Sequence, residues 1–569
     1  MNAFKSLYAS PLLRILLNRY SFFLLGLYFY TVFIASRGGL DTGSFFWHWI
    51  ELFFLLYFYT YFYLILKPGM WRPLLAAIPI LISYFIQDLY FLVYGKVLRL
   101  IEVLELPELL QVIPFSYIIL IAVFIILPVA VFAARINYKN LRPILLGAVP
   151  IISLVLLIVI SPTAYTDFVR SAGNGVVKYS DAASVENNGR FTMLAFSEAE
   201  RYHSLSMTEP YRDRLEYEQM VNTRSDELKQ TSNQRNVHMI VLESFLDPRL
   251  FKRARFDRNP AHPDFEKLFG KDTGLSRSPV FGGATAQAEF EVLCGVPALE
   301  KLSSVEFNVF TGSPVFCLPG MLNRVGYRAL ASNAYKPNFF NARPAYEGMG
   351  FSEIHFPQEY TATDDSYIST GNVSEEGFMF DEELFDQNLA YVKKILKENQ
   401  NKPLFNYVMT IYGHTPHILD PKLRPELITI SSKYPDDHLQ RAANQFYYRT
   451  QAIANYVNAL IKLDKNSLII LVSDHVPPLR NGPNTYRALN YAGNIKNAYY
   501  YNPLMIIENG RVLKLKNIRH FDLPDIVYNY ITDGAYCRKG SCAFLESSPL
   551  PERRSYINEY YSLMAHASE

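Results

Sequence analysis

The chain has 569 residues and a net charge of +2 at neutral pH, with 55 Lys and Arg against 53 Asp and Glu. This balanced charge is not typical of proteins that bind nucleic acids, which usually carry a basic face, so no nucleic-acid partner is expected. Long apolar runs are concentrated before about residue 162, and charged residues become common after it. The chain therefore divides into two domains in two different solvents.

Before residue 162 the sequence contains five apolar segments that are long enough to cross a membrane, for which about 20 residues are needed. The predicted spans cover residues 19–36, 46–66, 74–94, 114–134 and 143–160, within a transmembrane domain at residues 1–162. The first segment has no small-residue cleavage site, so a cleaved signal peptide is not expected. Residues 97–112 differ, because Leu, Val and Ile alternate there with charged residues, as is typical of a helix in the membrane interface.

Lys and Arg in the loops between spans indicate which ends are cytoplasmic. They are concentrated before the first span, after the second (Lys67 and Arg72) and after the fourth (Arg135, Lys139 and Arg142). The N-terminus is therefore expected in the cytoplasm. Five crossings, an odd number, place the residues after 162 outside the cytoplasm.

Two acidic residues, Glu51 and Asp88, fall within or near the predicted spans. Ionisable side chains inside a membrane are costly and often functional. A structural interpretation is favoured here, because Glu51 is close to a span end and Asp88 can bond a neighbouring helix. A role in substrate binding is the alternative.

After the spans, residues 163–235 have few large apolar runs and predict a juxtamembrane connector of short helices. From residue 236 short apolar strands, at 237–242, 404–411 and 468–473, alternate with helical patterns at 286–293, 381–399 and 439–463. Strands that alternate with helices predict an α/β domain with a largely parallel sheet, at residues 236–535. Residues 536–569 are expected to form a C-terminal tail.

Acidic residues and histidines follow the predicted strands, namely Glu243, His414, Asp474 and His475. An acid after a strand is commonly a turn residue, and a single His is commonly an ordinary surface or core group. Ligands of such sheets, however, bind beyond the carboxyl ends of the strands. Together these side chains are suitable oxygen and nitrogen donors for a divalent metal such as Zn²⁺ or Mn²⁺.

Thr285 precedes a predicted helix and follows Gly282 and Gly283. A Thr at this position is commonly an N-cap residue. A metal-coordinated hydroxyl would have a lowered pKa and become a nucleophile, and a helix N-terminus favours a bound phosphate. The arrangement is suited to attack on a phosphate ester.

The chain has four cysteines, and all lie after the predicted spans: Cys294, Cys317, Cys537 and Cys542. The spacing of Cys537 and Cys542 predicts a small disulfide loop in an oxidising compartment, with two free thiols as the alternative. No zinc-ribbon spacing or His pair accompanies them.

In order and spacing, several short stretches resemble the lipoteichoic acid synthase and phosphoglycerol transferase family, whose outer domain is alkaline-phosphatase-like (sulfatase-like). They are Val-Leu-Glu-Ser at 241–244, Gly-Gly-Ala-Thr-Ala-Gln-Ala-Glu-Phe at 282–290, Phe351 after Gly-Met-Gly, Tyr-Gly-His-Thr-Pro at 412–416 and Ser-Asp-His at 473–475. The resemblance covers nearly the whole chain. It implies that Glu243, Thr285, Asp474 and His475 bind one catalytic metal, Mn²⁺ or Zn²⁺ with Mg²⁺ as a further candidate, and that Thr285 is the nucleophile.

The resemblance also implies substrate-binding residues. His414 matches the family histidine that contacts the substrate phosphate. The aromatic–Asn–Arg stretch of the family corresponds to residues 339–343, which gives Phe340, Asn341 and Arg343, with Phe where Trp is common and Arg one place late. Family histidines near Asn333 and shortly after His475 are missing, so the headgroup or acceptor is expected to differ from that of the lipoteichoic acid enzymes.

The family resemblance predicts transfer of phosphoglycerol from phosphatidylglycerol to a hydroxyl of a cell-envelope glycan, through a covalent threonine intermediate. The enzyme would be a multi-pass protein of the bacterial inner (cytoplasmic) membrane, with a periplasmic or extracellular catalytic domain. Its partners would be a phospholipid donor, a glycan or surface-polymer acceptor and the bilayer itself.

Other functions fit the residues less well. A sulfatase needs a Cys/Ser-x-Pro-x-Arg segment, which Cys294-Gly-Val-Pro297 does not match. A phosphoethanolamine transferase acting on lipid A or another envelope glycan is the first alternative, although Ala, Gln and Glu flank Thr285 in place of Ser and Thr. A non-catalytic membrane protein that binds glycans or lipids is the second, and a transporter is disfavoured because no internal repeat is evident.

Overall fold

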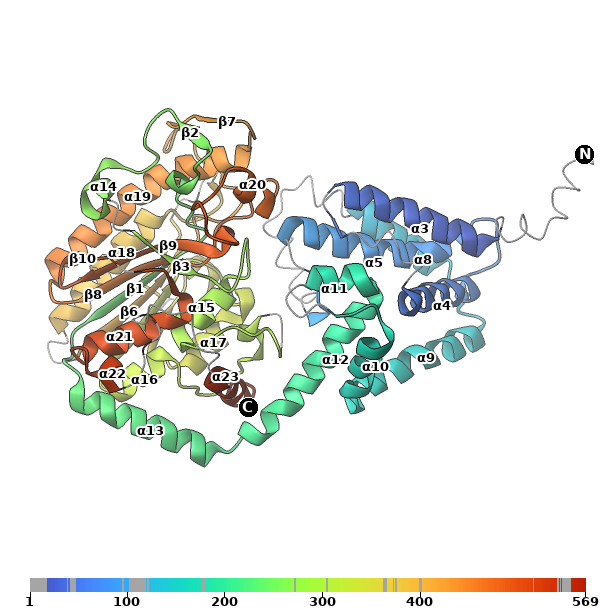
Figure 1. Ribbon diagram of the computed structural model, residues 1–569, viewed down its shortest axis with the longest axis horizontal. Coiled ribbons are helices and arrows are strands. Elements are labelled where there is room, and N and C mark those ends of the chain that lie inside the picture. Colours follow the sequence, from blue (N-terminus) through green and yellow to red (C-terminus); the bar gives the residue numbers. More distant parts are fainter. Residues whose placement is uncertain are drawn as a thin grey trace, which may run out of the picture. The chain divides into compact units, whose positions relative to one another are not determined.

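The computed structural model describes residues 18–569 except residues 38, 41–47, 95–96, 102–118, 120–121, 177–180, 271–272, 303–304, 362–365, 372, 374–375, 399–401, 515, 540–541, 543 and 545–553. The chain divides into two compact units, Met1–Ser206 and Met207–Glu569 (Figure 1). The first is helical, and the second is an α/β unit.

The described helices of the first unit follow the apolar segments of the sequence. They are α3 (Arg19–Ser36), α4 (Trp49–Ile65), α5 (Arg72–Tyr94), the π-helical η3 (Ala122–Ile126), α8 (Leu127–Ala134), α9 (Leu141–Ile160), α10 (Pro162–Ala172), α11 (Asp181–Asn188) and α12 (Arg190–Thr208). The helices predicted for residues 163–235 are therefore present, and they continue into the second unit as α13 (Arg214–Thr231).

Three described helices are long and apolar enough to cross a membrane, at Arg19–Ser36, Arg72–Leu92 and Leu141–Ile160. The second and fourth predicted spans correspond to shorter apolar helices, Trp49–Ile65 and Val123–Ala134. The count of five spans is thus not confirmed. Part of the fourth predicted span and residues 102–112 of the predicted interfacial helix lie outside the described residues.

The α9 helix shows the surface expected of a span. Its apolar side chains are largely exposed, with Leu145 64%, Leu146 71% and Ile160 77% accessible. A helix that is apolar on all sides and exposed is suited to contact with lipid tails.

Glu51 is fully buried in the first unit and is bonded on both carboxylate oxygens. Oε1 accepts hydrogen bonds from the hydroxyl of Tyr84 (2.6 Å) and the backbone N–H of Phe191 (3.1 Å). Oε2 accepts from the backbone N–H and the hydroxyl of Thr192, both at 2.9 Å. The carboxylate therefore satisfies free N–H groups in the first turn of α12, where a negative charge is favourable.

Asp88 is also buried and forms an ion pair with Arg190, the first residue of α12. It also accepts a hydrogen bond from the hydroxyl of Tyr30 at 2.9 Å. Both acids of the spans thus have partners inside the unit, which supports the structural interpretation of these residues.

The second unit contains a nine-stranded sheet in the order β11-β3-β9-β8-β1-β6-β4-β5, with β10 paired to β9. Its strands are β1 (Val237–Leu242), β3 (Gly274–Arg277), β4 (Arg328–Asn333), β5 (Glu353–His355), β6 (Leu404–Met409), β8 (Leu468–Ser473), β9 (Tyr501–Glu508), β10 (Arg511–Leu513) and β11 (Ile518–Arg519), while β2 (Ala254–Phe256) and β7 (Ile430–Ser432) form a separate pair. The pairings of β1 with β6 and β8, of β4 with β5 and β6, and of β3 with β11 are parallel. Those of β9 are antiparallel, so the sheet is mixed and mostly parallel, as predicted.

Helices cover both faces of this sheet (Figure 1). The described helices are α14 (Pro263–Phe269), α15 (Thr285–Cys294), α16 (Leu318–Arg324), α17 (Ala342–Met349), α18 (Asp381–Glu398), α19 (Asp437–Leu463), α20 (Pro483–Ala488), α21 (Leu523–Ile531), α22 (Ala535–Lys539) and α23 (Arg554–Ala567). Every residue of β1, β6 and β8 is buried, which explains why these strands are mostly apolar in the sequence.

Two disulfides lie in the second unit. Cys537 is bonded to Cys542, the pair that the spacing indicated, and Cys294 is bonded to Cys317. The second bond joins the last residue of α15 to the N-cap residue of α16.

Candidate active site

The register of the central strands brings two acidic residues together. In the parallel pair of β1 and β8, Leu242 lies opposite Ser473. Each is the last residue of its strand, and the next residues are Glu243 on one side and Asp474 and His475 on the other. The two strands therefore deliver their acids to the same edge of the sheet, as the sequence predicted.

Thr285 reaches this edge from α15, which begins at that residue. The loop before it is tightly turned, since Ala284 has φ 59° and Gly282 has φ 71°. A Cβ atom on Gly282 would also lie 2.9 Å from Cβ of Pro478, so glycine is required for both backbone conformation and space. The turn directs the Thr285 hydroxyl toward the strand ends.

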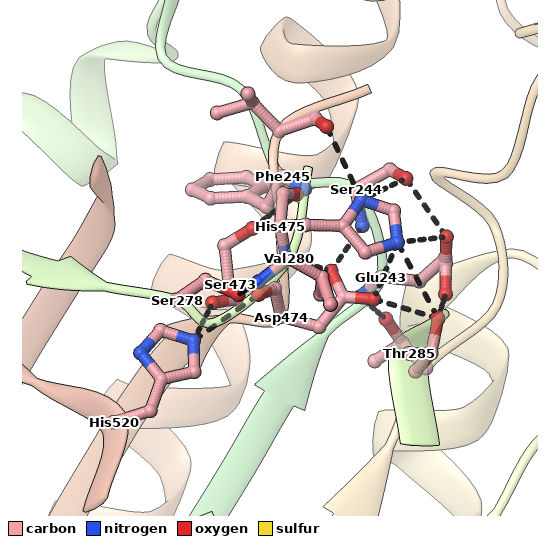
Figure 2. Close-up of polar contacts among 12 residues, drawn as sticks. Glu243, Ser244, Phe245, Ser278, Val280, Thr285, Ser473, Asp474, His475 and His520 are labelled. Carbon is pink, nitrogen blue, oxygen red and sulfur yellow. Dashed lines mark hydrogen bonds and ion pairs between the residues drawn. The ribbon is translucent and has the colours of Figure 1, made fainter. Parts of the chain in front are cut away.

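The hydroxyl of Thr285 lies among the three other candidate ligands (Figure 2). Its Oγ1 is 3.1 Å from Oε2 of Glu243, 2.9 Å from Oδ2 of Asp474 and 3.5 Å from Nε2 of His475. Ligand atoms of Glu243, Asp474 and His475 all lie within 4.8 Å of one another, and the three residues are buried. The structure thus brings together all four residues that the sequence assigned to a metal.

The remaining atoms of these side chains are fixed by the surrounding backbone. Oδ1 of Asp474 accepts the N–H groups of Ser244 (2.7 Å) and His475 (2.6 Å), which leaves Oδ2 for Thr285. Nδ1 of His475 lies 3.2 Å from the carbonyl oxygen of Val476 and so carries the proton. Its Nε2 then presents a lone pair to the cluster, 3.5 Å from Oγ1 of Thr285 and 3.2 Å from Oδ2 of Asp474.

The donor set fits a divalent cation. Burial raises the pKa of Glu243, Asp474 raises it further, and His475 and His414 act in the opposite direction. Burial likewise raises the pKa of Asp474, to about 7. Two buried carboxylates, an imidazole nitrogen and a hydroxyl oxygen are the ligand types of Zn²⁺ and Mn²⁺, and a cation would balance the acids.

Arg449 supports the site from α19, and no pattern in the sequence pointed to it. Its Nη1 donates to the carbonyl oxygen of Glu243 (2.8 Å), and its Nε donates to Asp381 (2.7 Å). Gly413 packs against this contact, because a Cβ atom there would lie 1.9 Å from the Glu243 carbonyl oxygen. This close approach explains the glycine before His414.

His520 is a second supporting residue that sequence reasoning missed (Figure 2). It is fully buried, and its Nε2 donates to the carbonyl oxygens of Ser473 (3.0 Å) and Asp474 (3.1 Å). Its Nδ1 lies 2.7 Å from the hydroxyl of Ser276. The ring therefore fixes the end of β8 from behind the candidate ligands.

His414 follows β6, the other neighbour of β1, and is half-buried. Its Nδ1 donates to the carbonyl oxygen of Thr415 (2.8 Å), and its ring packs on Phe378 with 5.1 Å between centroids. It is close to the cluster without being part of it.

A pocket opens beside Thr285. It is lined by Glu243, Thr285, Glu289, Phe307, Asn333, Tyr335, Lys336, Phe339, Phe340, Ala342, Met409, Thr410 and Ile411. The structure therefore places Phe340 in this pocket. Asn341 instead donates to the carbonyl oxygens of Phe307 and Phe310 (both 2.8 Å), and Arg343 lies over the ring of Phe356.

Comparison with known proteins relates the second unit to a large group of enzymes. The Sulfatase family model matches residues 235–527. A Rhizobium meliloti (strain 1021) protein with the provisional name cyclic beta-1,2-glucan modification protein is 25% identical over 252 residues, which are 43% of this chain and 36% of that protein. The chain thus matches 36% of the length of the curated relatives.

Two solved structures are similar to part of this chain. One is the Streptococcus pyogenes phosphoglycerol transferase GacH in complex with sn-glycerol-1-phosphate, with 18% identity, a TM-score of 0.48, and coverage of 64% of this chain and 92% of that chain. The other is the lipoteichoic acid synthase LtaP from Listeria monocytogenes, with 15% identity, a TM-score of 0.42, and coverage of 55% and 78%.

Proposed function

Because this chain belongs to the sulfatase family, we propose that it is a metal-dependent transferase that moves phosphoglycerol from phosphatidylglycerol to a hydroxyl of a cell-envelope glycan. One observation carries the proposal: the hydroxyl of Thr285, at the start of α15, lies within 3.5 Å of Glu243, Asp474 and His475. A nucleophile, a metal site and a helix N-terminus that favours phosphate are thus combined at one point.

The nucleophile distinguishes transfer of a phosphoryl group from hydrolysis of a sulfate ester. The residue at the helix start is Thr285, and Ala, Gln, Ala and Glu follow it. The Pro-x-Arg spacing expected after a sulfatase nucleophile does not occur there. The phosphoglycerol headgroup rests on the resemblance of residues 282–290 and 412–416 to the lipoteichoic acid synthase family.

In the first step, Oγ1 of Thr285 attacks the phosphorus of the donor and forms a new P–O bond. The P–O bond to diacylglycerol breaks, and the hydroxyl proton of Thr285 passes to water. His414, on the neighbouring strand end, contacts the phosphate and protonates the departing alkoxide.

In the second step, a hydroxyl of the glycan attacks the phosphorus of phosphoglycerol-Thr285. The glycan hydroxyl gives its proton to His414, which lost one in the first step, while the bond to Oγ1 breaks and Thr285 takes up a proton from water. A divalent metal bound by Glu243, Thr285, Asp474 and His475, Mn²⁺ or Zn²⁺ with Mg²⁺ as a further candidate, would lower the pKa of the Thr285 hydroxyl and neutralise charge on the phosphoryl oxygens.

The proposed location follows from the donor. A lipid headgroup is available only at a membrane surface, and three helices of the first unit are apolar and long enough to cross one. The basic loops predict a multi-pass protein of the bacterial inner membrane with a cytoplasmic N-terminus. Catalysis would take place on the periplasmic or extracellular side, where the two disulfides are stable.

Mass spectrometry of the peptide that contains Thr285 tests this function. The full-length protein, loaded with Mn²⁺ or Zn²⁺, is incubated with mixed phospholipids and without an acceptor. A phosphoglycerol adduct on Thr285, absent from the Thr285→Ala variant, is expected. An adduct of phosphoethanolamine would replace the proposed headgroup, and transfer by Thr285→Ala at near-normal rates would exclude the mechanism.

A further inference from the structure

Glu289 is an acid of the pocket that the proposed steps do not use. It lies four residues after Thr285 on α15, and both side chains line the same pocket. Residues four apart lie on one face of a helix, about 5–6 Å apart at Cβ. A three-carbon group attached through phosphorus to Thr285 can therefore reach one helical turn along this face.

Two buried tyrosines orient the Glu289 carboxylate. Tyr407 donates its hydroxyl proton to Oε2 at 2.6 Å, and Tyr346 donates to the same oxygen. The hydroxyl of Tyr346 in turn accepts a hydrogen bond from Nδ2 of Asn333 at 2.9 Å. Within the part of the chain that the structure describes, both hydrogen bonds of Glu289 end on Oε2. The carboxylate is thus a fixed acceptor beside the pocket.

Burying the Glu289 carboxylate is energetically unfavourable if its role is purely structural. Glu289 is 4% exposed, and burial raises its pKa to about 7, while the two tyrosines lower it. A buried acid without a cationic partner is unfavourable unless a ligand uses it. An apolar residue would pack α15 against the sheet without this cost.

The rest of the pocket suits a small polar group next to a phosphate. Lys336 supplies a positive charge, and the rings of Phe339 and Phe340 form a wall with 4.4 Å between their centroids. The positive charge favours the phosphate, and the acid offers an acceptor to a hydroxyl beyond it.

We propose that Glu289 accepts a hydrogen bond from a hydroxyl of the glycerol carried by the phosphorus, and that it thereby selects the headgroup. The proposal rests on the transferase function proposed above. It requires that the group attached to the phosphate present a hydrogen-bond donor to Glu289. Glycerol does so through its hydroxyls, and ethanolamine would do so through its ammonium group.

The test compares three donors with the full-length, metal-loaded protein: phosphatidylglycerol, phosphatidylethanolamine and phosphatidylmethanol, whose methyl group has no donor. Glu289→Gln keeps the shape of the side chain and removes its charge. It is expected to lower kcat/KM for phosphatidylglycerol by about 10- to 100-fold and to leave phosphatidylmethanol within about 2-fold. Glu289→Asp, whose shorter side chain withdraws the carboxylate from the pocket, should lower kcat/KM for phosphatidylglycerol by a smaller factor.

Glu291 provides a matched control on the same helix. It is also a buried acid, but it accepts a hydrogen bond from the backbone of Ala298 and is not among the described residues that line the pocket. Glu291→Gln should leave unchanged the ratio between the kcat/KM values for phosphatidylglycerol and phosphatidylmethanol. A loss of that ratio in the control would overturn the assignment to Glu289.

The remaining outcomes separate this inference from the proposed function. Equal losses for phosphatidylglycerol and phosphatidylmethanol in Glu289→Gln, or no loss, would overturn the inference and leave the function intact. A wild-type preference for phosphatidylethanolamine that Glu289→Gln removes would overturn the headgroup and support Glu289 as its receptor. If the protein transfers no headgroup from any of the three lipids, calorimetry tests the inference instead. Wild-type protein that binds glycerol phosphate more tightly than methyl phosphate, with this difference lost in Glu289→Gln, would support the inference. Equal binding of the two compounds by the wild type would overturn it.

Discussion

The hydroxyl of Thr285 lies 2.9 Å from Oδ2 of Asp474, although 189 positions separate the two residues in the sequence. Two backbone N–H groups occupy the other oxygen of Asp474, so this carboxylate can turn only one oxygen toward the site. Replacing that oxygen by an amide nitrogen, as in Asp474→Asn, removes a metal ligand while the backbone bonds to Oδ1 remain possible.

We therefore expect Asp474→Asn to lose bound metal and to lower transfer by about 100-fold or more. Metal content measured on the purified full-length protein, together with headgroup transfer, checks the prediction. Chelation of the wild type should reproduce the loss, and Mn²⁺ or Zn²⁺ should restore activity to the wild type but not to the variant. An Asp474→Asn protein with normal metal content would show that this residue is not a ligand.

His520 should affect the metal site without touching it. His520→Ala removes the donor to the carbonyl oxygens of Ser473 and Asp474, so the end of β8 becomes less well positioned. Metal affinity is expected to fall by about 10- to 100-fold, as for other residues that orient metal ligands. Competition with a chelator of known affinity measures this. Because the amide of Gln can donate to the same carbonyl oxygens, His520→Gln should recover part of the affinity, which a purely structural effect on folding would not predict.

Glu306 should make the stability of the second unit depend on pH. It is fully buried, its Oε1 accepts hydrogen bonds from the hydroxyl of Tyr560 (2.9 Å) and the backbone of Glu300 (2.7 Å), and its Oε2 has no partner among the described residues. Burial, and then the charge of Glu300, raises its pKa from 4.5 to about 7. Because the folded state holds this proton more tightly than the unfolded state, the contribution of protonated Glu306 to the free energy of unfolding is fully present below pH 4.5. It is lost as the pH rises through 7.

Since each pKa unit corresponds to about 1.4 kcal/mol, ionisation of Glu306 costs up to about 3 kcal/mol. Glu306→Gln removes this cost and should raise the Tm at pH 8 relative to the wild type, with little difference at pH 5. Thermal unfolding of the full-length protein in detergent at both pH values checks this. A constant difference between the two proteins across that range would contradict the assignment.

The disulfide between Cys294 and Cys317 closes a loop of 23 positions and joins the last residue of α15 to the N-cap residue of α16. A loop of this length stabilises a folded chain by about 3 kcal/mol. We expect the double variant Cys294→Ser/Cys317→Ser to unfold at a Tm several degrees lower and to lose transfer activity at a lower temperature. The double variant of Cys537 and Cys542, whose loop spans 5 positions, is the control and should show a smaller shift.

Much of the candidate site could be predicted because its candidate ligands lie at the ends of strands or at the start of a helix, which local sequence patterns indicate. Glu243 and Asp474 each follow a buried strand, and Thr285 begins a helix after two glycines, so parallel pairing was enough to place them together. Arg449 and His520 could not be found in this way. Each acts on a backbone carbonyl of a distant segment, and no local pattern records such a contact.

The aromatic–Asn–Arg stretch is the opposite case, because the sequence pattern was recognised but did not predict where its side chains lie. Residues 339–343 match a family pattern, yet only Phe340 of the three assigned residues lines the pocket. Asn341 is the N-cap residue of α17, in a left-handed conformation with φ 56°, and its amide donates to two carbonyl groups. A sequence match fixes the residue type but not the direction of the side chain. For the same reason the acids Glu51 and Asp88 could be located in the spans, whereas their partners on α12 could not.

The ion pair between Asp88 and Arg190 has a mechanical consequence. Both side chains are almost completely buried, and separating such a pair costs about 3–5 kcal/mol. The ion pair therefore holds the first turn of α12, a helix of 19 residues, against the apolar helix that carries Asp88. Substitution of Arg190 would leave the carboxylate of Asp88 buried without its cationic partner, so it is expected to destabilise the first unit by about this amount.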